Sequence, residues 1–171
     1  HIGVEYGSTA PLVQGKPTSA TGASQPNGLI GWGIAHEIGH NMDKLGQAET
    51  TNNIYSLALQ ARAGSALTLN TRLTEDGRWA TPFNKVAQAR PGTANNVFVQ
   101  LGMYWQLHLA YDNGEAPRSF YNAFFQLWKS GLYRSGGYSY DEQVALTAAK
   151  AANRTLTEFF TRWGMTLSDG A

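Results

Sequence analysis

The stretch from Gly31 to Asp43 reads GWGIAHEIGHNMD and contains the pattern H-E-x-x-H. Residues four apart on a helix share one face, so the pattern predicts a helix from Leu29 to about Met42 on which His36 and His40 direct their imidazole nitrogens at one metal ion. Glu37 follows the first histidine, where its carboxylate can accept a proton from water on that ion. The alternative is an ordinary helix with two solvent-facing histidines.

A zinc site also needs a third protein ligand and one open coordination position. The extended motif H-E-x-x-H-x-x-G-x-x-H is absent, because Asp43 and Gly46 stand where it requires glycine and histidine. Glu49 is the better candidate: Gly46 lets the chain turn, and Glu49 is predicted to begin a second helix that packs back on the first. The alternative for Glu49 is a carboxylate that stabilises a helix N-terminus. Asp43 is expected to support the ligands or to lie at the surface.

Two residues are expected to support this arrangement. Asn53 follows Glu49 by one helical turn and either hydrogen-bonds a histidine ligand, which fixes its tautomer, or ties two helices together as a buried amide. Gly39 lacks a side chain and would let the second helix approach closely.

Attack of a metal-activated water on a carbonyl group would form an oxyanion that a nearby side chain stabilises. The sequence does not decide which residue has this role. His108 lies among aromatic residues of a predicted core helix, and a buried, hydrogen-bonded histidine is the favoured interpretation. The alternative is that His108, Tyr104 or Tyr55 stabilises the oxyanion.

The rest of the chain is predicted to be mostly helical. Residues 1–28 form a loop-rich segment with a candidate edge strand at Ile2–Tyr6, and a small hairpin is expected within 65–80. Residues 29–171 form the helical, metal-bearing lobe. Its further predicted helices are Glu49–Ala63, Ala94–Tyr111, about Pro117–Tyr133, a helix opened by the capping box Ser139/Glu142 and ending near Ala152, and a short one opened by Thr155/Glu158 and stopped by Gly164.

Composition narrows the classes of function. The 171 residues are 42% hydrophobic and 12% aromatic, which is enough for a packed core. The net charge of +1 and the lack of a basic block argue against nucleic acid as a partner. The absence of cysteine excludes disulfides, thiolate zinc sites and cysteine nucleophiles, and no apolar run is long enough to span a membrane. The chain opens at His1 and is expected to be a piece of a longer protein.

Three segments carry a more specific likeness. WGIAHEIGHNMD, and then GQAETTNNIYSL from Gly46, resemble the enhancin-like family of zinc metallopeptidases, which includes viral enhancins and bacterial mucin-degrading O-glycopeptidases. The late segment Thr155–Gly164 resembles the closing helix of that family. The resemblance implies a zincin-like fold of the gluzincin type, with His36, His40 and Glu49 as ligands of Zn²⁺ and Glu37 as the general base that acts on a zinc-bound water.

The resemblance also implies a biological setting. We expect a secreted or cell-surface bacterial endopeptidase that cleaves O-glycosylated mucin-type proteins. Such peptidases carry a β-rich subdomain before the active-site helix, so an upstream β-rich domain of the same parent protein is an expected partner. Two alternatives stay open: a non-catalytic domain that binds glycans or host proteins on a zincin-like scaffold, which the intact Glu37 argues against, and a metallohydrolase with a non-peptide substrate.

Overall fold

The computed structural model describes residues 32–62, 97–112 and 119–168, and within those ranges it contains helices and no strand. The prediction of a mostly helical fold is therefore confirmed. The helices are α2 (Trp32–Met42), α3 (Asn53–Arg62), α5 (Val97–Tyr111), α6 (Phe120–Ser130), α7 (Tyr140–Ala152) and α8 (Thr157–Arg162). The predicted edge strand, the loop-rich segment 1–28 and the hairpin within 65–80 lie outside the described residues.

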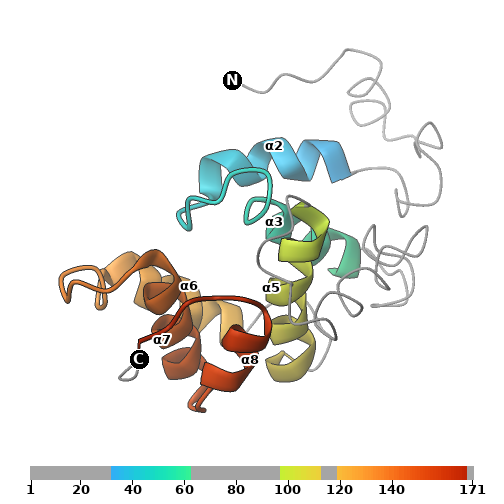
Figure 1. Cartoon of the computed structure of the whole chain (residues 1–171). Helices are drawn as coiled ribbons and strands as arrows, with labels where there is room; N and C mark the ends of the chain where they lie inside the picture. Colours follow the sequence, from blue (N-terminus) through green and yellow to red (C-terminus); the bar gives the residue numbers. More distant parts are fainter. Residues whose placement is uncertain (1–31, 63–96, 113–118, 169–171) are drawn as a thin grey trace, which may run out of the picture.

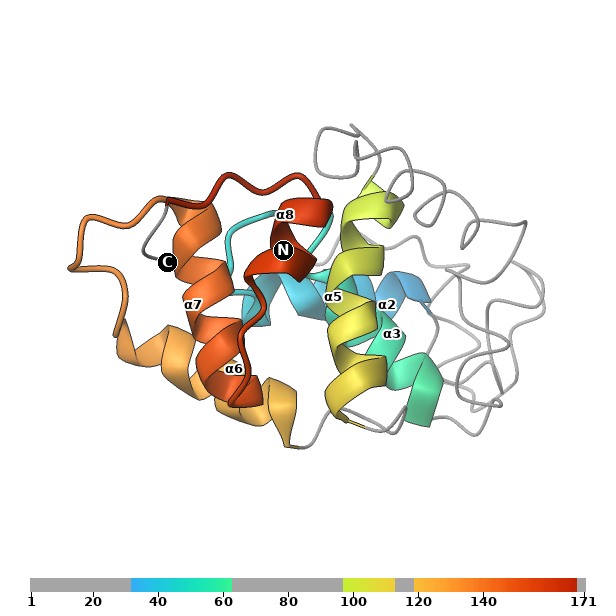
Figure 2. The ribbon, with the colours of Figure 1, turned by 60° about the horizontal axis from the view of Figure 1, so that its bottom comes forward.

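The helices pack mainly on their neighbours in the sequence. Contacts join α2 to α3, α3 to α5, α5 to α6 and α6 to α7 (Figure 1). The short helix α8 lies beside α5, where the indole nitrogen of Trp163 donates to Gln106 at 3.0 Å (Figure 2). The pair α2 and α3 thus sits at one end of a helical stack, and α5 supports it.

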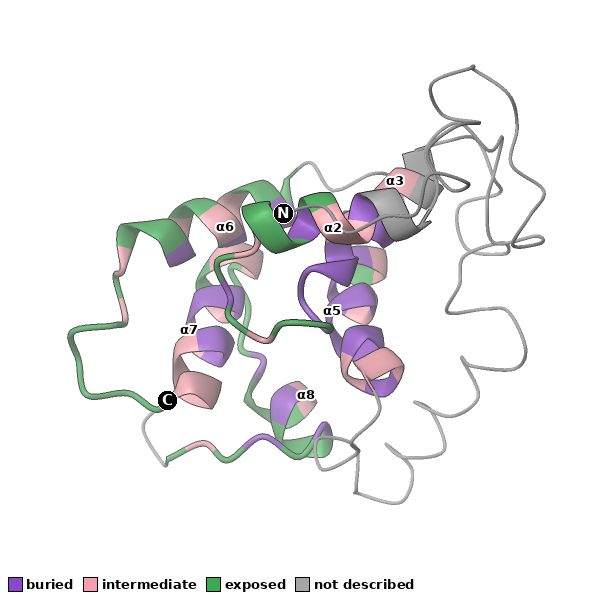
Figure 3. Ribbon diagram, turned by 90° about the horizontal axis from the view of Figure 1, so that it is seen from above, coloured by how far each residue is buried: buried purple, intermediate pink, exposed green. Residues whose placement is uncertain are grey.

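The core is centred on α5, which is buried on most of its sides, whereas α6 keeps one exposed face (Figure 3). Apolar side chains of α6 and α7 complete the core, and each one fully buried contributes about 1.5–3 kcal/mol. The fully buried large side chains include Tyr104, Tyr121, Phe124, Phe160, Leu57, Leu101, Leu107 and Val144.

The two predicted capping boxes have different outcomes. At α7 the prediction is confirmed: the Ser139 side chain accepts from the backbone N–H of Glu142, and the Glu142 carboxylate accepts from the backbone N–H of Ser139. At α8 the prediction is wrong, because the helix begins at Thr157 without a side-chain cap and Glu158 pairs with Arg162. Leu156, which directly precedes the helix, and Phe160 within it are buried.

Candidate metal centre

Helix α2 and the start of α3 lie in close contact at a glycine. A Cβ atom built on Gly39 would lie 2.4 Å from the carbonyl oxygen of Asn52, far inside contact distance. The predicted role of Gly39 in close approach is therefore seen, with the backbone at Asn52, directly before α3, as the partner. This contact brings the residues that open α3 beneath the histidine face of α2.

Glu49 does not begin a helix, and that part of the prediction is wrong. It lies in the turn between the helices with a backbone φ of 68°, and α3 begins four residues later at Asn53. A positive φ is uncommon for a residue with a side chain and costs energy. Local hydrogen bonds hold it: the side-chain amide of Asn53 donates to the carbonyl oxygen of Glu49 at 2.6 Å.

The turn nevertheless carries the Glu49 carboxylate to the two histidines. The Nε2 atoms of His36 and His40 lie 3.1 Å apart, and each lies 3.2 Å from one carboxylate oxygen of Glu49. Among the described residues these three form the group that could hold a metal ion, with their ligand atoms within 4.8 Å of one another. The group is open to solvent, since the side chains are 18%, 33% and 59% exposed.

The donor atoms fit a zinc ion. Zinc–nitrogen and zinc–oxygen distances of about 2.0–2.1 Å in a tetrahedral site place neighbouring ligand atoms about 3.3 Å apart. The separations of 3.1 and 3.2 Å here are close to that value. Two imidazoles and a carboxylate are also a ligand type that zinc accepts in sites that keep an open position.

Asn53 orients the first histidine. Its side-chain oxygen lies 2.7 Å from Nδ1 of His36, and the side chain is buried. Because that oxygen can only accept a hydrogen bond, Nδ1 of His36 carries the proton. Its Nε2 keeps a lone pair that points toward the other two ligand residues, His40 and Glu49. The two alternatives that the sequence left open for Asn53 coincide: this buried amide contacts a histidine of the group, and the same contact ties α3 to α2.

Asn52 is a contact that the sequence reasoning missed. Its buried side-chain nitrogen lies 3.2–3.4 Å from both ring nitrogens of His36 and of His40. It therefore contacts both rings, whose planes are nearly perpendicular. The only signal in the sequence is its place beside Asn53, and adjacent asparagines are common as helix caps.

Glu37 lies on α2 next to His36 with a partly exposed side chain. Its backbone carbonyl accepts from the Asn41 side chain at 3.1 Å. Asp43 does not contact the histidines. Its carboxylate accepts instead from the backbone N–H of Leu45 and from the hydroxyl of Thr51.

The three candidates for oxyanion stabilisation are placed differently. His108 is wholly buried and bonded to Asp112, as the favoured interpretation expects, and burial lowers its pKa. Tyr104 is also wholly buried, and its hydroxyl donates to Gln47 at 3.2 Å. Tyr55 is half-buried, and its hydroxyl donates to the carbonyl oxygen of Met42 at 3.3 Å. In this arrangement neither His108 nor Tyr104 offers a group to a substrate.

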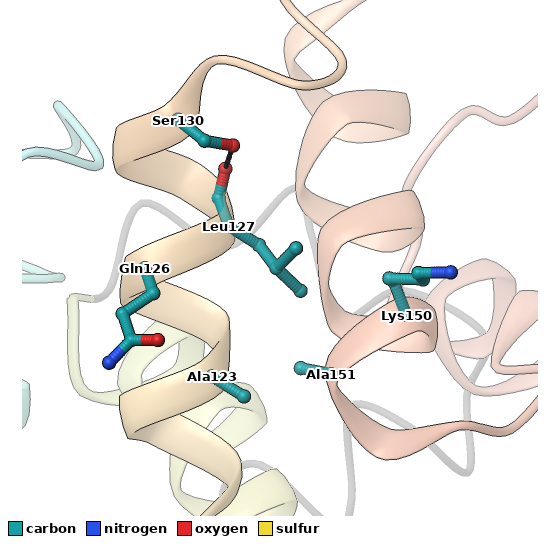
Figure 4. A pocket seen from close by; sticks show the side chains of 6 residues that line it. All are labelled: Ala123, Gln126, Leu127, Ser130, Lys150 and Ala151. Carbon is teal, nitrogen blue, oxygen red and sulfur yellow. Dashed lines mark hydrogen bonds between the residues drawn. The ribbon is translucent and has the colours of Figure 1, made fainter.

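A separate hollow of about 350 Å³ lies between α6 and α7 (Figure 4). Its lining residues are Ala123, Gln126, Leu127, Ser130, Lys150 and Ala151. None of these side chains is a carboxylate, an imidazole or a thiol, so this lining offers none of the usual ligands of a metal ion. The chemistry of the described residues is concentrated at the end of the stack formed by α2 and α3.

A helix that carries H-E-x-x-H beside a further carboxylate is the arrangement of a metallopeptidase. Comparison with known families agrees, because the family described as peptidase M60, enhancin and enhancin-like, matches residues 2–164. The chain belongs to this family of metallopeptidases. No curated protein and no solved structure matches it. Among the described residues no helix is long and apolar enough to cross a membrane.

Proposed function

We propose that this chain is the metal-bearing lobe of a zinc-dependent endopeptidase that hydrolyses peptide bonds in O-glycosylated, mucin-type proteins outside the cell. The observation that carries the proposal is the convergence of His36, His40 and Glu49, whose facing donor atoms lie 3.1–3.2 Å apart at an exposed position. Membership of the peptidase M60 family supports the peptidase chemistry.

His36, His40 and Glu49 would hold the ion, and Asn53 keeps His36 in the tautomer that offers Nε2. A bound Zn²⁺ supplies a Lewis acid that polarises the peptide carbonyl and lowers the pKa of water. Glu37 accepts the proton of the attacking water and then delivers it to the departing amine. The carboxylate suits this role because it follows a ligand directly and is not itself part of the ligand group.

We propose the substrate and the location from the resemblance of the sequence to the enhancin-like family, which includes mucin-degrading O-glycopeptidases. A peptidase whose substrates are mucin-type glycoproteins works outside the cell, as a secreted or surface-attached enzyme. The β-rich subdomain that such enzymes carry before the active-site helix would supply the edge along which a peptide aligns. We therefore propose an upstream β-rich domain of the same parent protein as the partner of this lobe.

The first test is the metal content of the purified chain after zinc loading and dialysis, measured by elemental mass spectrometry. We expect near one zinc per chain. Absence of zinc would contradict the assignment of the metal group. Cleavage of an O-glycosylated peptide is then compared with cleavage of the same peptide without its glycan.

The variant Glu37→Gln separates catalysis from metal binding. We expect it to keep its zinc and to lose about 10²–10⁴-fold in turnover, because an amide cannot accept the proton. Mass spectrometry of the cleaved glycopeptide measures the rate. Equal turnover by the wild type and the variant would remove Glu37 from the mechanism. Glycopeptide binding without cleavage by either protein would instead favour a non-catalytic glycan-binding domain.

A further inference from the structure

The turn that carries Glu49 must be held firmly, because Glu49 has a left-handed backbone conformation that a residue with a side chain rarely adopts. The turn is not part of a helix, but its backbone is hydrogen-bonded: the N–H groups of Thr50 and Thr51 both donate to the carbonyl oxygen of Gln47. Its side chains nevertheless enter the interior, and Thr50, Thr51 and Asn52 are 0–2% exposed. The groups that these buried polar residues contact therefore decide where the Glu49 carboxylate lies.

Thr51 links this turn to the end of the histidine helix. Its hydroxyl donates to the carboxylate of Asp43 at 2.7 Å, with the carbonyl oxygen of Gln47 as a second acceptor at 3.0 Å. The backbone N–H of Asp43 donates to the carbonyl oxygen of Gly39 in the last turn of α2. The bond thus joins a residue two positions after Glu49 to a residue three positions after His40. It therefore connects the turn that carries Glu49 to the end of the helix that carries His36 and His40.

The position of Asp43 argues that this bond is specific. A carboxylate beyond the C-terminus of a helix faces the negative end of the helix dipole and is disfavoured there. Asp43 is fully engaged in spite of this: one oxygen accepts from the backbone N–H of Leu45 at 2.9 Å and the other from Thr51. Its carboxylate therefore organises the turn.

A second anchor comes from the core. The hydroxyl of Thr50 donates to the side-chain oxygen of Gln100 on α5 at 2.9 Å, and Tyr104, one helical turn further, donates to Gln47. Helix α5 thus bonds the turn through Gln100 and Tyr104, while Asp43 bonds it to the end of α2. Asn53 joins Glu49 to His36, and the Thr51 bond joins the same turn to the chain just beyond His40.

We propose that Thr51 is a positioning residue for metal binding: anchored on Asp43, it sets the distance between the Glu49 carboxylate and the two imidazoles. This inference rests on the proposed metal site. It assigns a function to a residue that touches neither the ion nor the substrate.

The test compares two isosteric substitutions in the full chain. Thr51→Val removes the hydroxyl that bonds Asp43, and Thr147→Val removes an equally buried hydroxyl that bonds Gln143 within α7. Zinc dissociation constants are measured by competition with a chelating dye, and unfolding is followed by circular dichroism. We expect Thr51→Val to weaken zinc binding about 10–100-fold, the range for residues that orient metal ligands. Thr147→Val should lower Tm without changing zinc affinity.

Two further variants keep the test decisive. Thr51→Ser retains a hydroxyl and should restore the affinity, whereas Asp43→Ala removes the partner and should weaken binding as Thr51→Val does. The visible absorption of the Co²⁺-loaded protein reports the ligand geometry independently of activity, and it should change in Thr51→Val and Asp43→Ala only.

The outcomes separate this inference from the proposed function. Unchanged zinc affinity in Thr51→Val or, if that variant does not fold, in Asp43→Ala would overturn the inference while the wild type still binds zinc. Equal weakening in Thr147→Val would overturn it as well, because the effect would then be general destabilisation. A wild-type chain that binds no zinc would overturn both.

Discussion

Among the described residues, histidine faces a carboxylate at the same distance in two groups that have opposite surroundings. His36 and His40 each lie 3.2 Å from Glu49, and His108 lies 3.2 Å from Asp112. The first group is 18–59% exposed, whereas the side chains of the second are 0% and 1% exposed. Residue type and distance are therefore not what distinguishes a candidate metal site from a part of the core.

The other contacts of each carboxylate make the difference. The second oxygen of Asp112 accepts from the backbone N–H groups of Ser119 and Phe120 and from the hydroxyl of Ser119, which ties α5 to the start of α6. The carboxylate of Glu49 faces only the two imidazoles among the described residues. A carboxylate that is saturated by backbone donors holds a fold together, and one that faces only histidines is available to an ion.

The sharpest contrast comes from removing one histidine of the exposed group. His36→Ala should abolish stoichiometric zinc binding, with an affinity loss greater than the 100-fold or so that changes around a ligand produce. Its stability without metal should fall by only about 1 kcal/mol, because the side chain is partly exposed. Elemental analysis and urea unfolding measure the two quantities. Retention of one zinc per chain by this variant would break the contrast.

The corresponding change in the core should have the reverse effect. His108→Ala leaves a cavity and removes the bond to a buried carboxylate, so it should lower the free energy of unfolding by about 2–4 kcal/mol. Zinc affinity of the folded variant should stay at the wild-type value. Urea unfolding and dye competition on the same preparation test this. A loss of zinc affinity at unchanged stability would place His108 with the metal group.

The smallest expected effect is a dependence of stability on pH. Burial lowers the pKa of His108 from its ordinary 6.5, and the hydrogen bond to Asp112 offsets part of this shift. The unfolded chain then binds more protons than the folded one between the two pKa values, so stability falls as pH drops through 6.5 and levels off below the folded pKa.

The variant His108→Gln isolates this contribution, because glutamine keeps a polar side chain and cannot titrate. Urea midpoints of metal-free protein between pH 5 and 8 should decline less steeply towards acid in the variant than in the wild type. Parallel profiles for the two proteins would show that burial of His108 does not contribute to acid sensitivity.

Much of this arrangement could be predicted from local patterns. The H-E-x-x-H spacing predicted the helix that carries His36 and His40, and the pair Ser139/Glu142 predicted the start of α7. These features depend on residues within one helical turn of one another, so the sequence displays them directly. The predicted start of α8 was wrong, because the buried Leu156 and not Thr155 directly precedes the helix, and no side-chain cap forms there.

The sequence predicted that Glu49 lies beside the two histidines, but it did not predict the left-handed backbone conformation of this residue. A left-handed conformation at a residue other than glycine leaves no mark in a sequence. Here it depends on the bond from Asn53 and on the anchoring of Thr51 to Asp43, which no spacing rule includes. The hydrogen bonds of the turn with Gln100 and Tyr104 could not be predicted for a different reason, because α5 lies about 50 residues further along the chain.

The short span of the metal group has a consequence for how the protein folds. His36, His40, Glu49 and the orienting Asn53 all lie within residues 36–53, so bringing the ligands together closes only a short loop. The entropy lost on closing a loop grows with its length, and a short flexible loop is closed within about 10–100 ns. The ligand residues can therefore come together before α5 packs against them. Packing of α5 then stabilises a site whose ligands are already close to one another.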